Sequence, residues 1–292
     1  MDYILLIIAA ILLAVNFAIN NIYQKRQGVS MESSLKFNLW LGFFTAAIFF
    51  AGSGFQCEWN IFSLFMAVLM MLFSTTYTFI GFAVMQRGMM SLYTLFLMAG
   101  GMLVPYVCGV LFLNEPFLKV QLLGLILIIS ALFINHIGSK KVDGKTLVLL
   151  LSVFLLNGFV SVVSKLHQIN PVAVSSNDFV TLTGAIKFIV CAVLLIPIKR
   201  STNRENLVDE NGKGKKKFIF FLITISAVIS GVSYLLQLVG AKNVNATVLY
   251  PFITGGTVVF TMIVDWICFK NKPSFKIIVG AILCLLGTCL FL

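Results

Sequence analysis

The sequence has 292 residues, of which 60% are hydrophobic and 11% are charged, and its mean hydropathy is +1.03. A soluble globular domain carries about 25% charged residues, so this composition excludes a soluble protein and indicates an integral membrane protein. The net charge of +11 would suggest a nucleic-acid partner for a soluble chain. In a membrane protein it is instead expected from lysines that orient the loops.

Apolar runs follow one another along the chain, each long enough to cross a hydrocarbon core about 30 Å thick as a helix. They predict an all-α integral membrane protein with ten transmembrane helices at 3–24, 33–52, 60–85, 88–112, 118–137, 145–166, 176–198, 217–240, 245–269 and 274–292. The longest polar segment, 199–217, is predicted to be a mobile linker between the seventh and eighth spans.

The positive charges predict how the chain is oriented. Most of the 21 lysine and arginine residues lie in connections after odd-numbered spans. The connections after even-numbered spans hold only Lys119, Lys165 and Lys242. Since positively charged loops stay in the cytoplasm, the odd-numbered connections are predicted to be cytoplasmic and both termini to lie outside.

The two halves of the chain, 1–138 and 139–292, resemble each other. Similar residues recur in the same order: Asn16 with Asn157, Asn20 with Ser161, Tyr77 with Tyr234, and NEPFLKVQLLG (114–124) with NKPSFKIIVG (271–280). Because five is an odd number of spans, the second copy would insert upside down. The pattern predicts a 5+5 inverted-topology repeat, which is typical of alternating access around a site near the membrane midplane. The alternative is that the spans share only a membrane composition.

The segment FLNEPFLKVQLLGLILIISALFI (112–134) follows the fourth span. With ten short-looped spans in two halves, the chain resembles the drug/metabolite transporter superfamily, and within it the EamA-like family. The resemblance rests on an Asn-Glu-Pro turn followed by an apolar helix with Gln and Gly, here Asn114, Glu115, Pro116, Gln121 and Gly124. It implies a basket of ten helices that moves a small metabolite. The second half departs from the motif, because Lys272 stands where the acidic residue is expected.

Polar side chains within a bilayer core face the protein interior or a water-filled cavity. The predicted substrate-binding residues are Lys187, Asn16, Asn20, Asn157, Tyr77, Tyr234, Gln237 and Tyr250. The alternative for the asparagines and hydroxyl residues is interhelical hydrogen bonding, worth about 0.6 kcal/mol on average.

Lys187 is the central residue of its span, about 16 Å from either end at 1.5 Å per residue. That is too far for its side chain to reach the membrane surface. Its ammonium therefore meets an anionic substrate in a wet cavity, is uncharged, or pairs with a buried acid.

These features predict a secondary transporter that moves a small polar metabolite, such as an amino acid or other carboxylate, across the cytoplasmic membrane by alternating access. Its partners would be the small-molecule substrate and the lipid bilayer, not nucleic acid. The sequence has no catalytic pattern, so neither an enzyme, a cofactor nor a metal site is expected, and it does not indicate an oligomeric state. The alternative function is a flippase for a lipid-linked carrier, or a lipid-binding membrane subunit.

Overall fold

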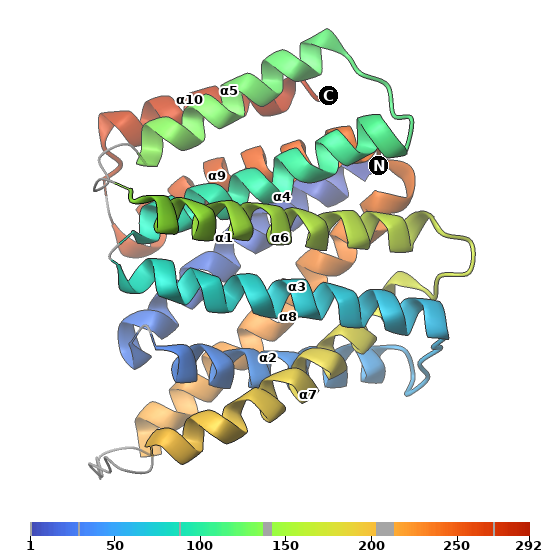
Figure 1. The fold of residues 1–292 in the computed structure, drawn as a ribbon, viewed down its shortest axis with the longest axis vertical. Coiled ribbons are helices and arrows are strands. Elements are labelled where there is room, and N and C mark those ends of the chain that lie inside the picture. Colours follow the sequence, from blue (N-terminus) through green and yellow to red (C-terminus); the bar gives the residue numbers. More distant parts are fainter. Residues whose placement is uncertain (1, 29, 88, 137–141, 203–212, 271) are drawn as a thin grey trace.

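A chain inside a bilayer must pair its backbone N–H and C=O groups internally, and in the computed structural model each predicted span does so as an α-helix (Figure 1). The structure describes residues 2–28, 30–87, 89–136, 142–202, 213–270 and 272–292. Within them the helices are α1 (Asp2–Gln27), α2 (Met31–Gly52), α3 (Ile61–Gln86), α4 (Met90–Phe112), α5 (Lys119–His136), α6 (Gly144–Ile169), α7 (Ser176–Thr202), α8 (Lys213–Asn243), α9 (Ala246–Phe269) and α10 (Phe275–Cys289).

Local sequence signals set several helix ends. After α1, Gly28 adopts a φ of 77°, a left-handed conformation that glycine reaches without steric cost. The Ser30 hydroxyl caps α2 by accepting the Ser33 N–H at 3.1 Å. The Asn60 side chain caps α3 by accepting the Ser63 N–H at 2.7 Å. These bonds satisfy backbone donors that a helix start leaves unpaired.

Eight of the described helices are long and apolar enough to cross a membrane. The apolar parts of α5 and α10 are shorter. Helix α10 has 15 residues, about 22 Å at 1.5 Å per residue, against a hydrocarbon core of about 30 Å. The protein is therefore an all-helical, multi-pass membrane protein, and the full count of ten spans stays a prediction.

The predicted linker 199–217 was too long at both ends. Helix α7 continues to Thr202, and α8 begins at Lys213. The reason is that lysine and arginine are good helix formers, so a helix does not stop where its apolar run stops. Residues 203–212 lie outside the described residues.

The helices run across the molecule in alternating directions (Figure 1). Helices α5 and α10 pack together at one edge, α2 and α7 pack together at the opposite edge, and the remaining helices lie between them. Both chain termini lie at the same end of the bundle. We call this end, which also holds the connections after even-numbered helices, the terminal end. The opposite end, where odd-numbered helices finish, is the linker end.

The two edge pairs meet through glycine. A Cβ atom on Gly42 of α2 would lie 2.8 Å from the Gly184 carbonyl oxygen of α7. A Cβ atom on Gly124 of α5 would lie 2.7 Å from the Gly287 carbonyl oxygen of α10. Close backbone approach through small residues is how membrane helices gain packing energy where lipid offers no hydrophobic driving force.

Candidate substrate-binding site

Helices α1, α2, α3, α6, α7, α8 and α9 surround a central cavity of about 390 Å³. Its lining combines hydroxyl, amide and phenol groups with a single ammonium group. The polar lining residues are Asn16, Thr45, Ser74, Tyr77, Ser161, Ser164, Thr183, Lys187, Ser230, Tyr234, Gln237 and Tyr250. The fold thus brings six of the predicted substrate-binding residues to one cavity: Asn16, Tyr77, Lys187, Tyr234, Gln237 and Tyr250.

Lys187 comes to the cavity on α7, one turn beyond the close contact between α7 and α2. A Cβ atom on Gly42 of α2 would lie 3.2 Å from the Lys187 Cβ. The Cβ of Lys187 is therefore packed against α2, and its side chain extends from there to the cavity lining. Among the described residues of the lining, Lys187 is the only lysine, arginine or acidic residue. Among the described residues, no hydrogen bond or salt bridge holds its ammonium, and the buried-acid interpretation therefore has no described partner.

The tyrosines on α8 and α9 are held in place by neighbours from α6. The Tyr234 hydroxyl lies 3.0 Å from the Ser164 hydroxyl. The Tyr250 hydroxyl donates to the Ser161 carbonyl oxygen at 2.5 Å. These bonds fix two phenol rings on the wall of the cavity, so the site is pre-organised on this side.

The two cavity amides are each anchored by one end. Asn16 Oδ1 accepts a hydrogen bond from the Ser226 hydroxyl at 2.5 Å, and Gln237 Nε2 donates to the Ser233 hydroxyl at 3.2 Å. Within the described chain, no hydrogen bond uses Asn16 Nδ2 or Gln237 Oε1. Each amide therefore keeps one group for a ligand.

Two predicted residues do not line this cavity. Asn20 lines a separate cavity of about 180 Å³ at the linker end, and its buried Oδ1 has no described hydrogen-bond partner. Asn157 of α6 donates from Nδ2 to the Leu97 carbonyl oxygen of α4 at 2.7 Å. Asn157 thus joins two helices, which matches the interhelical alternative in the sequence analysis.

Replacing Asn157 with alanine is expected to lower stability and leave ligand binding unchanged. The change removes the donor to the Leu97 carbonyl, and an interhelical hydrogen bond in a membrane contributes about 0.6 kcal/mol on average. Thermal unfolding in detergent measures the loss, and ligand titration of the same sample measures affinity. A clear fall in affinity without a loss of stability would contradict the structural role.

Several lining residues were not predicted from the sequence: Thr45, Ser74 and Thr183. Isolated hydroxyl residues carry little signal, because they commonly bond to their own helix, as the Thr183 hydroxyl does with the Val180 carbonyl. Ser74 could have been found, since it lies three residues before Tyr77 and so on the same helix face.

Lys165 also differs from its predicted place. Its charge was counted with the connection that follows the predicted span 145–166, at the end of which it lies, but it is 5% exposed and α6 extends past it to Ile169. Its ammonium donates to the carbonyl oxygens of Ala241 and Val244 at 2.7 Å each. These two bonds provide the partners that a buried ammonium requires.

The central cavity continues toward the linker end. A small cavity of about 30 Å³ shares Met71, Ser74 and Lys187 with it. The cavity of about 180 Å³ shares Leu41 with it and reaches the exposed residue Ser30. Cavities that share lining residues thus follow one another from Lys187 toward the linker end.

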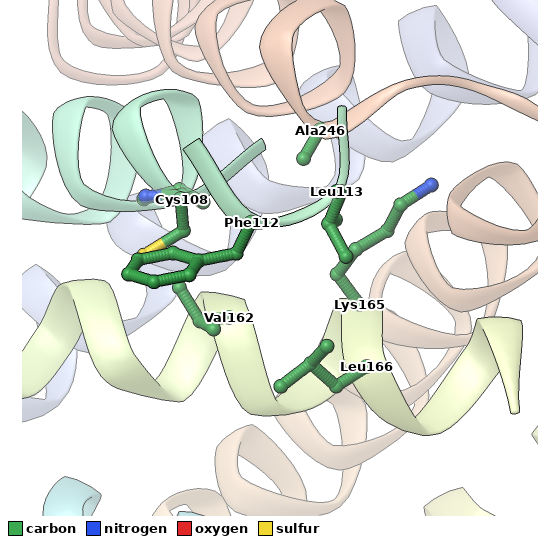
Figure 2. Close-up of a pocket in the computed structure, with 8 residues that line it drawn as sticks. Cys108, Phe112, Leu113, Val162, Lys165, Leu166 and Ala246 are labelled. Atoms are coloured by element: carbon green, nitrogen blue, oxygen red, sulfur yellow. The ribbon is translucent and has the colours of Figure 1, made fainter. Parts of the chain in front are cut away.

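A further cavity, of about 210 Å³, lies between α4, α6 and the start of α9 near the terminal end. Figure 2 shows Cys108 and Phe112 at one side of it, with the Lys165 nitrogen directed away from them. Apart from Lys165 its lining is apolar, and it shares no lining residue with the central cavity. This cavity does not offer a polar solute the hydrogen-bonding groups it would need.

The described residues contain no group of three or more His, Cys, Asp or Glu side chains arranged to hold a metal ion.

Comparison with known proteins identifies the family. The sequence model of the EamA-like transporter family matches residues 144–292, which comprise α6 to α10. No protein of curated function matches the sequence. One solved structure, described only as "Crystal structure of protein", shares 12% identity with this chain. The similarity covers 99% of this chain and 94% of that one with a TM-score of 0.73, and it shows a common fold alone. Since the family match covers half of the sequence, the chain belongs to the EamA-like transporter family of the drug/metabolite transporter superfamily.

Proposed function

We propose that this membrane transporter moves a small polar metabolite with an anionic group, such as an amino acid or other carboxylate, by alternating access. The observation that carries the proposal is Lys187, the only lysine, arginine or acidic residue among the described lining residues of the central cavity. No described protein group neutralises it, so an anionic ligand would gain a charge-assisted hydrogen bond in a desolvated site.

The size and chemistry of the cavity support this substrate class. Ligand pockets commonly measure about 300–1,000 Å³, and the central cavity measures about 390 Å³. Phenol groups from Tyr77, Tyr234 and Tyr250, together with the amides of Asn16 and Gln237, line the same cavity as Lys187. A cationic solute would find no carboxylate among these lining residues, which disfavours a cationic drug or polyamine.

The packing of the helices supports the 5+5 inverted repeat of 1–138 and 139–292. Adding five to each helix number maps the pair α4 and α6 onto α9 and α1, and the pair α3 and α6 onto α8 and α1, and all four pairs are in contact. The pairs α2 with α7, α4 with α9 and α5 with α10 map onto themselves and also pack together. The family match supports the same division, because it begins where α6 begins.

The distribution of charge supports an orientation in the cytoplasmic membrane with the linker end inside. Lys25 and Arg26 lie at the end of α1, Arg87 follows α3, and Lys270 follows α9, all at the linker end. Positively charged ends of this kind stay in the cytoplasm. Both termini would then lie outside.

A lipid-linked carrier is the second candidate substrate. The apolar cavity between α4 and α6 favours it, because Phe112 and Leu166 in its lining are exposed at the surface and an acyl chain could enter from the bilayer. Its separation from the central cavity gives such a chain no described route to Lys187, and the metabolite is therefore the better supported substrate.

The test is a thermal-shift screen of the detergent-purified protein against amino acids, other carboxylates, sugars, amines and a polyprenyl phosphate. A ligand that binds only the folded state stabilises it by about 2.7 kcal/mol at one hundred times its dissociation constant. We expect carboxylates to raise the unfolding temperature and amines without a carboxylate to leave it unchanged. Stabilisation by amines or by the polyprenyl phosphate alone would contradict the proposal.

A further inference from the structure

The start of α9 is capped from a distant part of the chain. Glu115, in the connection from α4 to α5, accepts the backbone N–H groups of Ala246 and Thr247 at 2.8 Å each. The local N-cap residue, Asn245, makes no side-chain cap bond. A carboxylate at this position also meets the positive end of the helix dipole. Glu115 therefore ties the α4–α5 connection to the turn between α8 and α9.

A positively charged side chain holds the end of α8, whereas the negatively charged Glu115 caps the start of α9. The Lys165 ammonium of α6 donates to the carbonyl oxygen of Ala241 in the last turn of α8 and to that of Val244, which directly follows α8. In Figure 2, Lys165 and Ala246 lie on the same side of the apolar cavity, with the ammonium turned away from it. A cation suits a helix C-terminus for the same reason that an anion suits an N-terminus. Two charges thus fasten one turn.

Near the terminal end, a buried side chain of α6 packs against α3 and α7. His167 of α6 is fully buried, stacks on Phe179 of α7 with ring centroids 3.6 Å apart, and its Nε2 lies 2.9 Å from the Ser63 hydroxyl of α3. These buried side chains pack together near the terminal end, whereas the cavities that share lining residues with the central cavity lie toward the linker end.

The helix contacts also differ between the two halves of the proposed repeat. Helix α8 packs against α6 and α7. Its counterpart in the proposed repeat is α3, whose contacts with α1 and α2 are at most marginal among the described residues. In the proposed repeat, α3 therefore packs less against α1 and α2 than α8 packs against α6 and α7.

The sequence accounts for this difference. In the repeat, Lys272 takes the position of Glu115, and Gln24 takes the position of Lys165. An ammonium group cannot accept backbone N–H groups, and Lys272 is exposed. The N-cap residue of α4, Met89, makes no side-chain cap bond either. In the described part of the turn between α3 and α4, no side chain thus takes the place that Glu115 takes at the start of α9.

The α3–α4 turn does have one charged contact of its own. The Arg87 guanidinium donates to the Thr146 hydroxyl and lies 3.6 Å from the Asp143 carboxylate. Both charged side chains are exposed, at 40% and 60%, so water screens the pair. The contact caps no helix and does not join α3 to α1.

We propose that Glu115 and Lys165 form a gate latch at the terminal end, and that the lack of a matching latch among the described linker-end residues makes the resting transporter face the linker end. The inference rests on the proposed alternating access and inverted repeat. With the predicted orientation, the empty site faces the cytoplasm. Opening the terminal end requires both side chains to release the α8–α9 turn.

The test measures access to the cavity from each side of sealed membrane vesicles. A Ser161→Cys reporter on the cavity wall is treated with a membrane-impermeant maleimide, and labelling of each cysteine is read by peptide mass spectrometry. Native Cys57, in the connection from α2 to α3, marks the terminal end. We expect the reporter to react from the linker end, and Glu115→Gln to raise its labelling rate from the terminal end at least tenfold.

The matched control is Glu58→Gln, which removes an exposed acidic residue at the same end and is expected to leave both rates unchanged. A folded Glu115→Gln protein with an unchanged terminal-end rate would overturn the latch, as would an equal rise in the control. Labelling needs no substrate. A failed ligand screen with a positive labelling result would therefore count against the proposed substrate and not against the latch.

Two further variants decide the question if Glu115→Gln does not fold. Gly109→Ala places a Cβ 2.6 Å from Glu115 Oε2, displaces the carboxylate without changing the charge, and is expected to open the terminal end. Lys272→Glu adds the missing acceptor at the linker end and is expected to lower labelling from that side severalfold. If Glu115 only stabilises the fold, Lys272→Glu should not change the side from which the reporter is labelled. An unchanged sidedness of labelling would therefore overturn the proposal.

Discussion

Replacing Lys187 with methionine is expected to abolish transport while the protein stays folded. Methionine keeps most of the length of the side chain and removes the only lysine, arginine or acidic residue among the described lining residues of the central cavity. Removing one partner of a buried, hydrogen-bonded charge pair costs about 2–5 kcal/mol. Since about 1.4 kcal/mol is a tenfold change, affinity for an anionic substrate should fall by at least about thirtyfold. Uptake into proteoliposomes and ligand titration measure the two effects.

The Lys187→Met change should not lower the stability of the protein, although it lowers the affinity for the substrate. A charge near the bilayer centre costs about 2.5–3.5 kcal/mol on insertion scales, and no described carboxylate compensates Lys187. The Lys187→Met protein should therefore unfold at the same temperature as the original chain or higher. Lys187→Arg keeps the charge and is expected to retain part of the affinity. Normal transport by Lys187→Met would rule out Lys187 as the substrate contact.

Replacing Gly100 with alanine is expected to lower the stability of the protein more than the other substitutions do. Gly100 of α4 faces the backbone of α6, where a Cβ would lie 2.1 Å from the Phe154 carbonyl oxygen and 2.6 Å from its carbonyl carbon. These atoms belong to the backbone, so no change of rotamer relieves the clash and the two helices must separate. Overpacking costs about 1–3 kcal/mol and more where the backbone moves, against a gain of about 1 kcal/mol in helix propensity.

Thermal unfolding in detergent measures this loss, and Gly52→Ala is the matched control. Gly52 ends α2, and a Cβ there would meet nothing within 4 Å. The control gains helix propensity without a clash and should be as stable as the original chain or slightly more so. Equal unfolding temperatures for the two variants would contradict the close contact between α4 and α6.

The helices followed directly from the sequence, since an apolar run in lipid has no other way to pair its backbone. Periodicity also predicted much of the cavity lining. Tyr234 and Gln237 lie three residues apart on one face of α8, and that face lines the cavity in the structure. Asn20 and Asn157 met the same criterion of a large polar group in an apolar run. Their sequence context does not distinguish a contact with a neighbouring helix from a contact with a cavity.

Sequence patterns could not predict contacts between residues that are distant in the sequence and are brought together by the fold. Glu115 was read as part of a turn motif, and its role on α9 depends on backbone groups more than a hundred positions away. Lys165 was counted among the loop charges, although α6 carries it into the interior. Charge alone does not show whether a lysine near a helix end reaches water or the carbonyl groups of another helix.

By itself, the sequence determined that this protein is a helical membrane protein, where its helices lie, and that Lys187 is a central charge in an apolar run. Hydropathy and length suffice for this, because lipid imposes the same requirement on every backbone group. The tertiary structure alone decided that Lys187 faces a cavity and that Glu115 and Lys165 fasten the α8–α9 turn. The physical reason is that lipid excludes polar groups from the outer surface of the bundle without selecting their partners inside it. Those partners are set by which helices pack together.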